Sequence, residues 1–182
     1  MKLIALLIIS AFLSAAEVQT YMSPSENVEK ALVDAIQNEK KGIKVAIYTF
    51  TNKRIAKALV DAKNRGVAVE VLVDPFSVKL GGAVSTLLDA DVPVYVYIPE
   101  GKNCWTSILH HKFCLFEEMK GVWTGSYNFT YKAENSNSEN AVLITGDEAG
   151  YQKFDNEFNT LKSNRTEVVT KKEKTPTIKG ND

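Results

Sequence analysis

The residues best suited to chemistry stand close together in one segment, LHHKFCLFEEMKGVWTGSYNFTY, which begins at Leu109. Both histidines of the chain, His110 and His111, lie there, and Lys112 follows them. If the segment forms a strand, His110 and Lys112 share one face and His111 points to the other. A neutral imidazole can attack phosphorus, and a nearby ammonium can hold a phosphate oxygen. The pair therefore indicates phosphate chemistry.

A second polar group follows a turn near Met119–Gly121, in the run Gly125-Ser126-Tyr127-Asn128. It would bring further hydrogen-bond donors to the same place. An isolated His-x-Lys is common by chance and would mark only a stray histidine on a buried edge strand. Here an apolar run, the acid Glu117 and the Gly-Ser-x-Asn run follow in order. This longer pattern favours the functional interpretation.

Hydrophobic periodicity predicts the elements that must position these residues. Expected strands, besides the one that carries His110 and Lys112, are Ile43–Phe50, Val67–Val73, Pro93–Ile98 and Asn140–Ile144. Expected helices are Pro24 to Lys40, Lys53 to Asn64, Ala83–Ala90, Ser126 to Lys132, and one from Gly146-Asp147 to about Leu161. The strand–helix–strand unit around Lys53 to Asn64 predicts two parallel strands. The sequence thus predicts an α/β fold with a mixed, largely parallel sheet flanked by helices on both faces.

Two helix starts carry capping signals. Ser23, followed by Pro24 and then Glu26, predicts the N-cap of the first helix, with proline at its first position and a capping-box glutamate. Thr51-Asn52 predicts the cap of the helix that begins at Lys53. Gly81-Gly82 lacks the Lys-Ser or Lys-Thr of a phosphate-binding loop, so we expect an ordinary loop there.

The ends of the chain differ in character from its middle. Residues 1–16 have a positive start at Lys2, an apolar run too short to span a membrane, and small residues before Glu17. They predict a signal peptide cleaved near Ala16; an uncleaved membrane anchor is the alternative. We expect a folded domain at 17–162 and a disordered polar tail at 163–182. Export would place the protein in the periplasm, at the outer membrane or outside the cell.

The composition indicates the size of the fold, how a polyanion could be bound, and whether a metal site is expected. The chain has 182 residues, 45% of them hydrophobic, which is enough for one domain with a real core. Its 22 basic and 22 acidic residues balance, so a polyanion must be held locally rather than by a global field. The only cysteines, Cys104 and Cys114, could form a disulfide in an oxidising compartment or remain free thiols. Together with the histidines they do not match a zinc-site spacing, and we predict no metal and no cofactor.

The pattern H-x-K-x4-acid followed by G-S-x-N resembles the signature of the phospholipase D superfamily. The likeness covers roughly Val28 to Phe158. It is strongest to the small single-motif members, the Nuc-type bacterial endonucleases, and within them to the exported, membrane-associated NucT nucleases. The resemblance implies a phospholipase D-like fold. One departure is Glu117, which stands where the family usually has aspartate; that position supports structure rather than touching substrate.

The resemblance also implies roles. His110 corresponds to the nucleophile that forms a phosphohistidine, while Lys112 and Asn128, supported by Ser126, hold the phosphate oxygens. Glu139 corresponds to the carboxylate that orients the histidine. The chemistry needs a second acid–base group, and His111 faces away, so we expect a homodimer with two His110 side chains at its two-fold axis.

Four further residues could contact the substrate, but the sequence signal for each is less specific. Lys53 and Arg54 follow the carboxyl end of a strand, where ligand sites gather in α/β folds, so they could contact a polyanion, although a solvated helix face is the default interpretation. Lys102 and Trp105 could hold a phosphate and stack a base, unless Trp105 packs into the core.

The sequence therefore predicts an exported, metal-independent endonuclease that hydrolyses DNA, with single strands favoured and RNA as a further substrate. Peripheral membrane association is expected from the likeness to the NucT nucleases. The alternatives are a phospholipase D or phosphatidyltransferase with the same chemistry, and a non-catalytic DNA-binding module.

Overall fold

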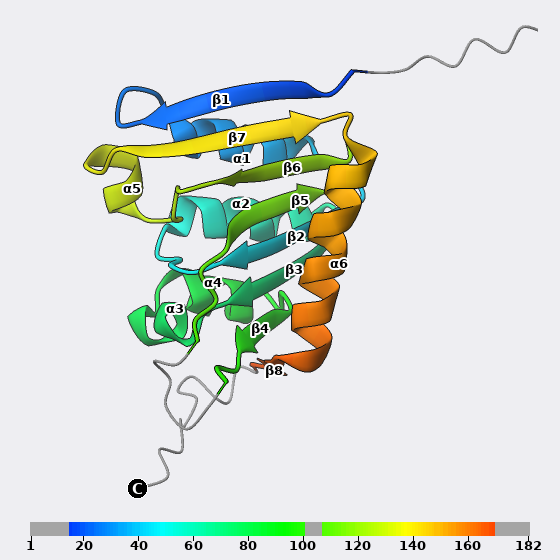
Figure 1. Ribbon diagram of the computed structural model, residues 1–182. Coiled ribbons are helices and arrows are strands. Elements are labelled where there is room, and N and C mark those ends of the chain that lie inside the picture. The colour runs from blue at the N-terminus through cyan, green and yellow to red at the C-terminus, as the bar shows by residue number, and fades with distance from the viewer. Residues whose placement is uncertain (1–14, 101–106, 170–182) are drawn as a thin grey trace, which may run out of the picture.

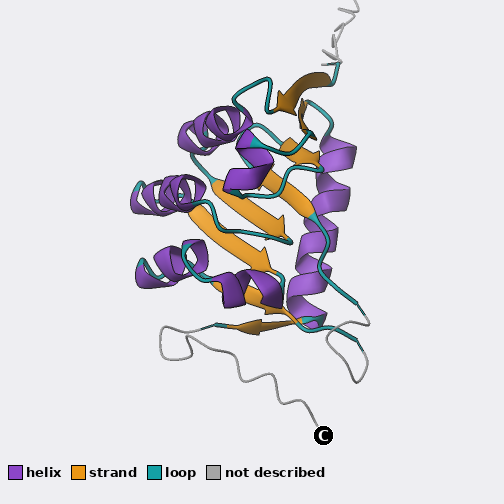
Figure 2. Ribbon diagram, turned by 90° about the vertical axis from the view of Figure 1, so that its left-hand side faces the viewer, coloured by secondary structure: helices purple, strands orange, loops and turns teal. Residues whose placement is uncertain are grey.

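The protein is built on one mixed sheet between two layers of helices, seen in a computed structural model that describes residues 15–100 and 107–169 (Figures 1 and 2). The strands are β1 (Glu17–Ser23), β2 (Gly42–Ile47), β3 (Ala68–Val73), β4 (Val94–Tyr97), β5 (Lys112–Phe116), β6 (Gly121–Gly125), β7 (Glu139–Thr145) and β8 (Thr166–Val168). The helices are α1 (Val28–Asn38), α2 (Lys53–Asn64), α3 (Pro75–Leu80), α4 (Ala83–Asp89), α5 (Tyr131–Asn135) and α6 (Glu148–Asn164).

The strands lie in the order β1-β7-β6-β5-β2-β3-β4-β8. Only the β2–β3 and β3–β4 pairs are parallel, while the other five pairs within the described ranges are antiparallel. The prediction of a largely parallel sheet is therefore wrong. The mixed α/β fold with helices on both faces is confirmed. The strand–helix–strand unit β2-α2-β3 is parallel as predicted, and α2 has the predicted bounds.

Alternation along β5 divides the core in two. Cys114 and Phe116 point into the larger cluster, which α1, α2 and α4 cover. Phe113 and Leu115 point into the smaller cluster, which α6 covers on the opposite face. Figure 2 shows α6 alone on one side of the sheet and the other helices on the opposite side. Buried on both faces, β5 is a fixed support for the residues at its start.

Three local expectations are wrong. Helix α1 is capped by Asn27, whose side chain accepts a hydrogen bond from the Lys30 N–H at 2.9 Å, whereas Ser23 ends β1. The sequence predicts no helix at residues 75–80, where the structure has α3. Helix α5 begins at Tyr131 rather than at Ser126, because the intervening residues form a loop held by backbone hydrogen bonds to β7 and to the segment after β2.

The carboxyl end of the fold extends beyond the predicted boundary. Helix α6 continues to Asn164, and β8 then pairs with β4, so residues 163–169 are not a disordered tail. Residues 170–182 lie outside the described residues, as do residues 1–14 of the predicted signal peptide. Among the helices that the structure describes, none combines the length and apolarity needed to cross a membrane.

Cys114 is a free thiol buried completely in the core. Burial raises the pKa of the Cys114 thiol well above its usual value. Cys104 lies outside the described residues.

Candidate active site

The predicted site residues gather at one edge of the sheet, on the left in Figure 1. There the parallel strands β2 and β3 end, and β5 begins opposite the end of β2, with Lys112 paired to Ile47. The next two strands continue the edge, because Gly125 at the end of β6 pairs with Ala141 near the start of β7. Ligand sites of α/β sheets gather at such carboxyl ends.

His110 and Lys112 lie on the same side of this edge, as alternation predicts, and Tyr48 lies against both. The His110 and Tyr48 ring centroids are 4.9 Å apart, and the Lys112 Nζ lies 5.3 Å from the Tyr48 ring centroid. Lys112 Nζ also donates a 2.7 Å hydrogen bond to the carbonyl of His110. These contacts place an imidazole and an ammonium side by side at the surface.

His111 points to the opposite face, toward α6. Its ring packs edge-on against Phe113, and its Nε2 lies 3.4 Å from the Glu157 carboxylate. The adjacent histidine is thus separated from His110 by the sheet.

The pKa of His110 is shifted in the direction that a nucleophilic imidazole needs. Desolvation lowers the pKa of His110, and the Lys112 charge lowers it further, while Asp74 opposes both. The neutral, nucleophilic imidazole is therefore favoured at neutral pH. Burial lowers the pKa of Lys112, and the Glu139 carboxylate opposes that shift.

Asp74 is a nearly buried carboxylate behind His110. Its Oδ2 accepts a 3.0 Å hydrogen bond from the N–H of Leu109, and its Oδ1 accepts one of 2.9 Å from Phe76 at the start of α3. Burial raises the pKa of Asp74, whereas the two N–H donors and His110 lower it. Asp74 thus fixes the backbone just before His110 and places a negative charge near the imidazole.

Replacing Asp74 with asparagine is expected to move the acid limb of the kcat/KM profile to lower pH. The Asp74 charge raises the pKa of His110, so its removal lowers that pKa, and the neutral imidazole persists at a lower pH. A pH–rate series on wild type and Asp74→Asn checks the shift. A loss of rate with an unmoved acid limb would mean that Asp74 acts only on structure.

The loop after β6 positions Asn128. The Asn128 Oδ1 accepts a 3.2 Å hydrogen bond from the N–H of Thr49, and the neighbouring Phe129 exchanges backbone hydrogen bonds with residues 49, 51 and 52. With Oδ1 used in this way, the amide nitrogen of Asn128 is the group left to donate to a phosphate oxygen. No hydrogen bond within the described ranges engages that nitrogen.

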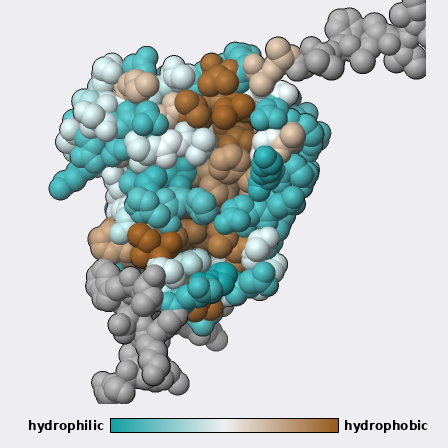
Figure 3. All heavy atoms as spheres, viewed as in Figure 1, coloured by the Kyte–Doolittle hydropathy of each residue, from teal (hydrophilic) through white to brown (hydrophobic). Residues whose placement is uncertain are grey.

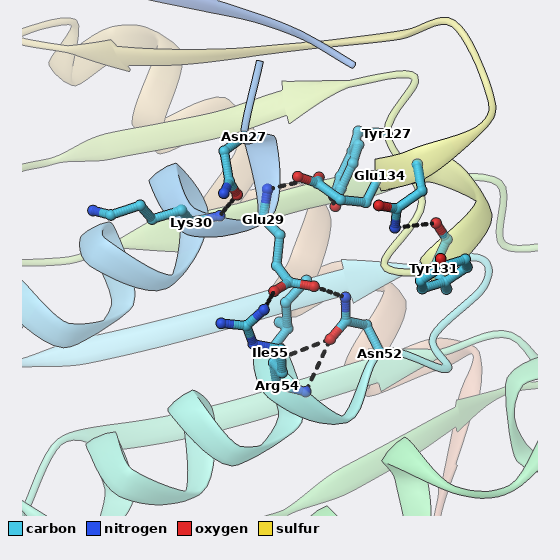
Figure 4. A network of polar contacts seen from close by, with 10 residues as sticks. Asn27, Glu29, Lys30, Asn52, Arg54, Ile55, Tyr127, Tyr131 and Glu134 are labelled. Atoms are coloured by element: carbon cyan, nitrogen blue, oxygen red, sulfur yellow. Dashed lines mark hydrogen bonds and ion pairs between the residues drawn. The ribbon is translucent and has the colours of Figure 1, made fainter. Parts of the chain in front are cut away.

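A polar network supports this loop from behind (Figure 4). The Glu134 carboxylate accepts hydrogen bonds of 2.8 Å from the Tyr127 hydroxyl and from the N–H of Glu29. The Glu29 carboxylate in turn accepts from Asn52, the cap of α2, and pairs with Arg54 at 3.0 Å. The loop of Asn128 is thereby tied to the first turns of α1 and α2.

Glu139 and Ser126 form a second pair at the start of β7. Ser126 Oγ donates to Glu139 Oε2 at 2.6 Å, and Asn137 Nδ2 donates to Glu139 Oε1 at 3.0 Å. In a single chain, no hydrogen bond of the described residues joins Glu139 to His110. The expected orienting contact is therefore not made within one chain, and Glu139 acts electrostatically on Lys112 instead.

Gly125 stands at the start of this loop, and the surrounding backbone leaves no room for a side chain there. A Cβ there would lie 2.2 Å from the carbonyl oxygen of Asn140, and the φ of +155° is one that L residues rarely adopt. We expect Gly125→Ala to destabilise the fold by about 3 kcal/mol, or roughly 6–12 °C in Tm. Gly66→Ala is the matched control, because Gly66 also has positive φ but nothing within 4 Å of its Cβ position. Thermal unfolding should show a much larger loss for Gly125→Ala; equal losses would contradict the clash.

The remaining candidates lie apart from this cluster. Glu117 follows the far end of β5, about 17 Å along the strand from Lys112, where its N–H donates to the Gly42 carbonyl. Arg54 is paired with Glu29 although its side chain is 85% exposed, and Lys53 is exposed at the start of α2. Lys102 and Trp105 lie outside the described residues.

Sequence reasoning missed Tyr48, Asp74 and Phe76. One signal could have found two of them: Tyr48 and Asp74 directly follow the ends of two parallel strands, at the edge where ligand sites gather.

The sequence matches a known family over most of its length. Residues 15–162 match the family model described as cardiolipin synthase, PLD-like domain. Phospholipase D of Rickettsia typhi is 29% identical over 153 residues, covering 84% of this chain and 72% of that protein. Phospholipase D of Rickettsia bellii is 32% identical over 133 residues, covering 72% of this chain and 63% of that protein. The mitochondrial cardiolipin hydrolase of Xenopus laevis is 31% identical over 123 residues, with 67% and 55% covered.

Two solved structures share the fold almost from end to end. Nuc of Salmonella typhimurium, a phospholipase D family member, has a TM-score of 0.75 and 28% identity, covering 86% of this chain and 99% of that chain. NucT of Helicobacter pylori has a TM-score of 0.73 at 22% identity, covering 84% and 99%, which is a likeness of fold. The chain belongs to the phospholipase D superfamily of phosphodiesterases, with its PLD-like domain at residues 15–162.

Proposed function

We propose that this protein is a metal-independent nuclease that hydrolyses phosphodiester bonds of DNA, with single strands favoured and RNA as a further substrate. The observation that carries the proposal is the placement of His110, Lys112 and Asn128 at one sheet edge, with the pKa of His110 lowered. The nearly complete match to the Nuc structure, at 28% identity, supports a nucleic-acid substrate.

In the proposed reaction, an imidazole nitrogen of His110 attacks phosphorus and forms a P–N bond. The P–O bond to the leaving oxygen breaks, and that oxygen takes up a proton. Water then attacks the phosphohistidine and gives a proton to the group that protonated the leaving oxygen, and the P–N bond breaks to restore the imidazole. Lys112 and the amide nitrogen of Asn128 bind the non-bridging oxygens, whose charge is concentrated in the transition state.

The proton for the leaving oxygen needs a second acid–base group. His111 lies on the other face beside Glu157, and Asp74 is nearly buried with both oxygens occupied. We therefore propose a homodimer in which His110 of a second copy supplies this group across a two-fold axis.

A phospholipid substrate is the second candidate, favoured by the names of the curated relatives, phospholipase D and cardiolipin hydrolase. The test offers the purified protein single-stranded and duplex oligonucleotides, RNA, and vesicles of phosphatidylcholine with cardiolipin, each with EDTA. We expect oligonucleotide cleavage that EDTA does not abolish. Lipid hydrolysis without oligonucleotide cleavage would support the second candidate. Activity lost in EDTA and restored by Mg²⁺ would contradict metal independence.

A further inference from the structure

A line of neighbouring rings leads from the exposed Phe76 to the nucleophile. The Phe76 and Tyr48 rings are stacked, with centroids 5.9 Å apart and planes 19° apart, and Tyr48 then lies 4.9 Å from the His110 ring. Phe76 is 45% exposed although it is a large apolar residue. Tyr48 stacks on one face of the Phe76 ring, which leaves the other face to contact a ligand.

This line of rings is held in place by buried polar groups. Ser77, with no exposed surface, donates a 2.7 Å hydrogen bond to the carbonyl of Tyr48 and accepts one of 2.9 Å from the N–H of Phe50. Asp74 caps the first turn of α3 by accepting from the N–H of Phe76, and it also accepts from the N–H of Leu109, next to His110. Two connections thus join the helix that carries Phe76 to the segments that carry Tyr48 and His110, so the rings keep their relative positions.

The surroundings of Phe76 suit a flat, charged polymer. Figure 1 shows α3 next to the segment that leads into β5, and Figure 3 shows apolar side chains gathered in this region beside polar ones. Lys79 is exposed three residues after Phe76 on the same helix. A base can stack on the free face of an aromatic ring, while a nearby lysine attracts the phosphate backbone.

We propose that Phe76 is the platform of a base-binding subsite, which stacks the base of a nucleotide next to the scissile phosphate. The subsite rests on the proposed nuclease function and identifies what that site recognises beside the phosphate: an unpaired base. A base that stacks on Phe76 must have one face free of the neighbouring base that covers it in a duplex, which fits the proposed preference for single strands. The stack of Phe76 on Tyr48 holds the Phe76 ring flat against its neighbour, which is the form of platform on which a base stacks.

The test combines three variants with two substrates. Phe76→Ala removes the platform, and Leu80→Ala is the matched control, because Leu80 is 46% exposed on the same helix. The substrates are a single-stranded oligonucleotide and the same strand with abasic residues on both sides of one cleavable phosphate. Phe76→Trp keeps a ring and serves as rescue.

We expect Phe76→Ala to lower kcat/KM on the base-bearing strand by roughly 5- to 150-fold. The abasic strand should lose little, because it has no base to stack. Phe76→Trp should restore the rate, and Leu80→Ala should leave it unchanged. An equal loss on both strands, or a loss with Leu80→Ala of the same size, would overturn the subsite.

Binding separates failure of the subsite from failure of the nuclease proposal. In fluorescence anisotropy with the His110→Ala background, the base-bearing strand should bind more tightly than the abasic strand, and Phe76→Ala should remove the difference. If wild type cleaves no oligonucleotide, the nuclease proposal fails while this measurement still tests the subsite. Equal binding of both strands by the Phe76-containing protein would overturn the subsite whether or not the enzyme cleaves. Weaker vesicle binding by Phe76→Ala without any oligonucleotide effect would assign the ring to lipid and overturn it as well.

Discussion

Replacing His110 with alanine is expected to abolish hydrolysis, with a loss in kcat on the order of 10⁴-fold or more, as for other nucleophiles that act within a catalytic unit. His110 is exposed and lies before β5 rather than in the core, so the fold should remain intact. Steady-state rates on a labelled oligonucleotide, together with a thermal unfolding curve, measure both effects.

His111→Ala is the control, because it removes the neighbouring imidazole from the opposite face. We expect it to retain activity, since its ring contacts Phe113 and Glu157 rather than the phosphate-binding residues. Activity that survives in His110→Ala, or an equal loss in His111→Ala, would contradict the assignment of the nucleophile.

The His110→Ala variant also tests the proposed dimer. If each site uses two His110 side chains, a mixed dimer of wild type and His110→Ala is inactive. Co-expression of differently tagged chains should then give a mixed species without activity. Half of the wild-type activity in the purified mixed dimer would show that each chain has an independent site.

The chemistry of the site could be predicted because it depends on short spacings. Alternation alone placed His110 beside Lys112 and turned His111 away, and the contacts with Tyr48 and Glu157 show that arrangement. Helix α2 was also predicted with its bounds, because Asn52 supplies a local cap that accepts from two backbone N–H groups.

The direction of the strands could not be predicted in the same way. Strands β5, β6 and β7 are apolar runs that would suit a parallel sheet equally well, and periodicity carries no direction. The turn at 117–120 joins β5 to β6 as an antiparallel hairpin, and that short connection was the one available signal. Strand β1 pairs with β7, which lies more than one hundred residues away in the sequence. Most side chains of β1 are exposed, and the segment contains no run of apolar residues that would mark it as a strand.

Hydrogen bonds between segments that lie far apart in the sequence also could not be predicted. Asp74 reaches Leu109, and Ser77 reaches Tyr48, only because β3 and β5 flank β2 at one sheet edge. For the same reason, the sequence could not show that Glu139 makes no hydrogen bond to His110 within one chain. A motif indicates which residues share a site, but the packed sheet determines which of them touch.

Replacing Lys112 with methionine is expected to lower kcat by about 10²–10³-fold, the usual effect of losing one group that stabilises transition-state charge. Methionine keeps an apolar stem beside Tyr48, so the change removes mainly the charge. Arginine should not restore the rate, because its planar fork cannot take the place of a compact ammonium that donates to the His110 carbonyl.

The pH profile distinguishes this role from simple binding. The Lys112 charge lowers the pKa of His110, so its removal raises that pKa and moves the acid limb of the residual kcat/KM to higher pH. Asp74→Asn moves it the opposite way, so the two variants bracket wild type. Lys120→Met is the control, because the Lys120 Nζ lies 4.8 Å from the Tyr151 ring centroid, beyond the far end of β5. An acid limb that stays fixed in Lys112→Met, or a comparable loss of rate in Lys120→Met, would contradict an electrostatic coupling between Lys112 and the nucleophile.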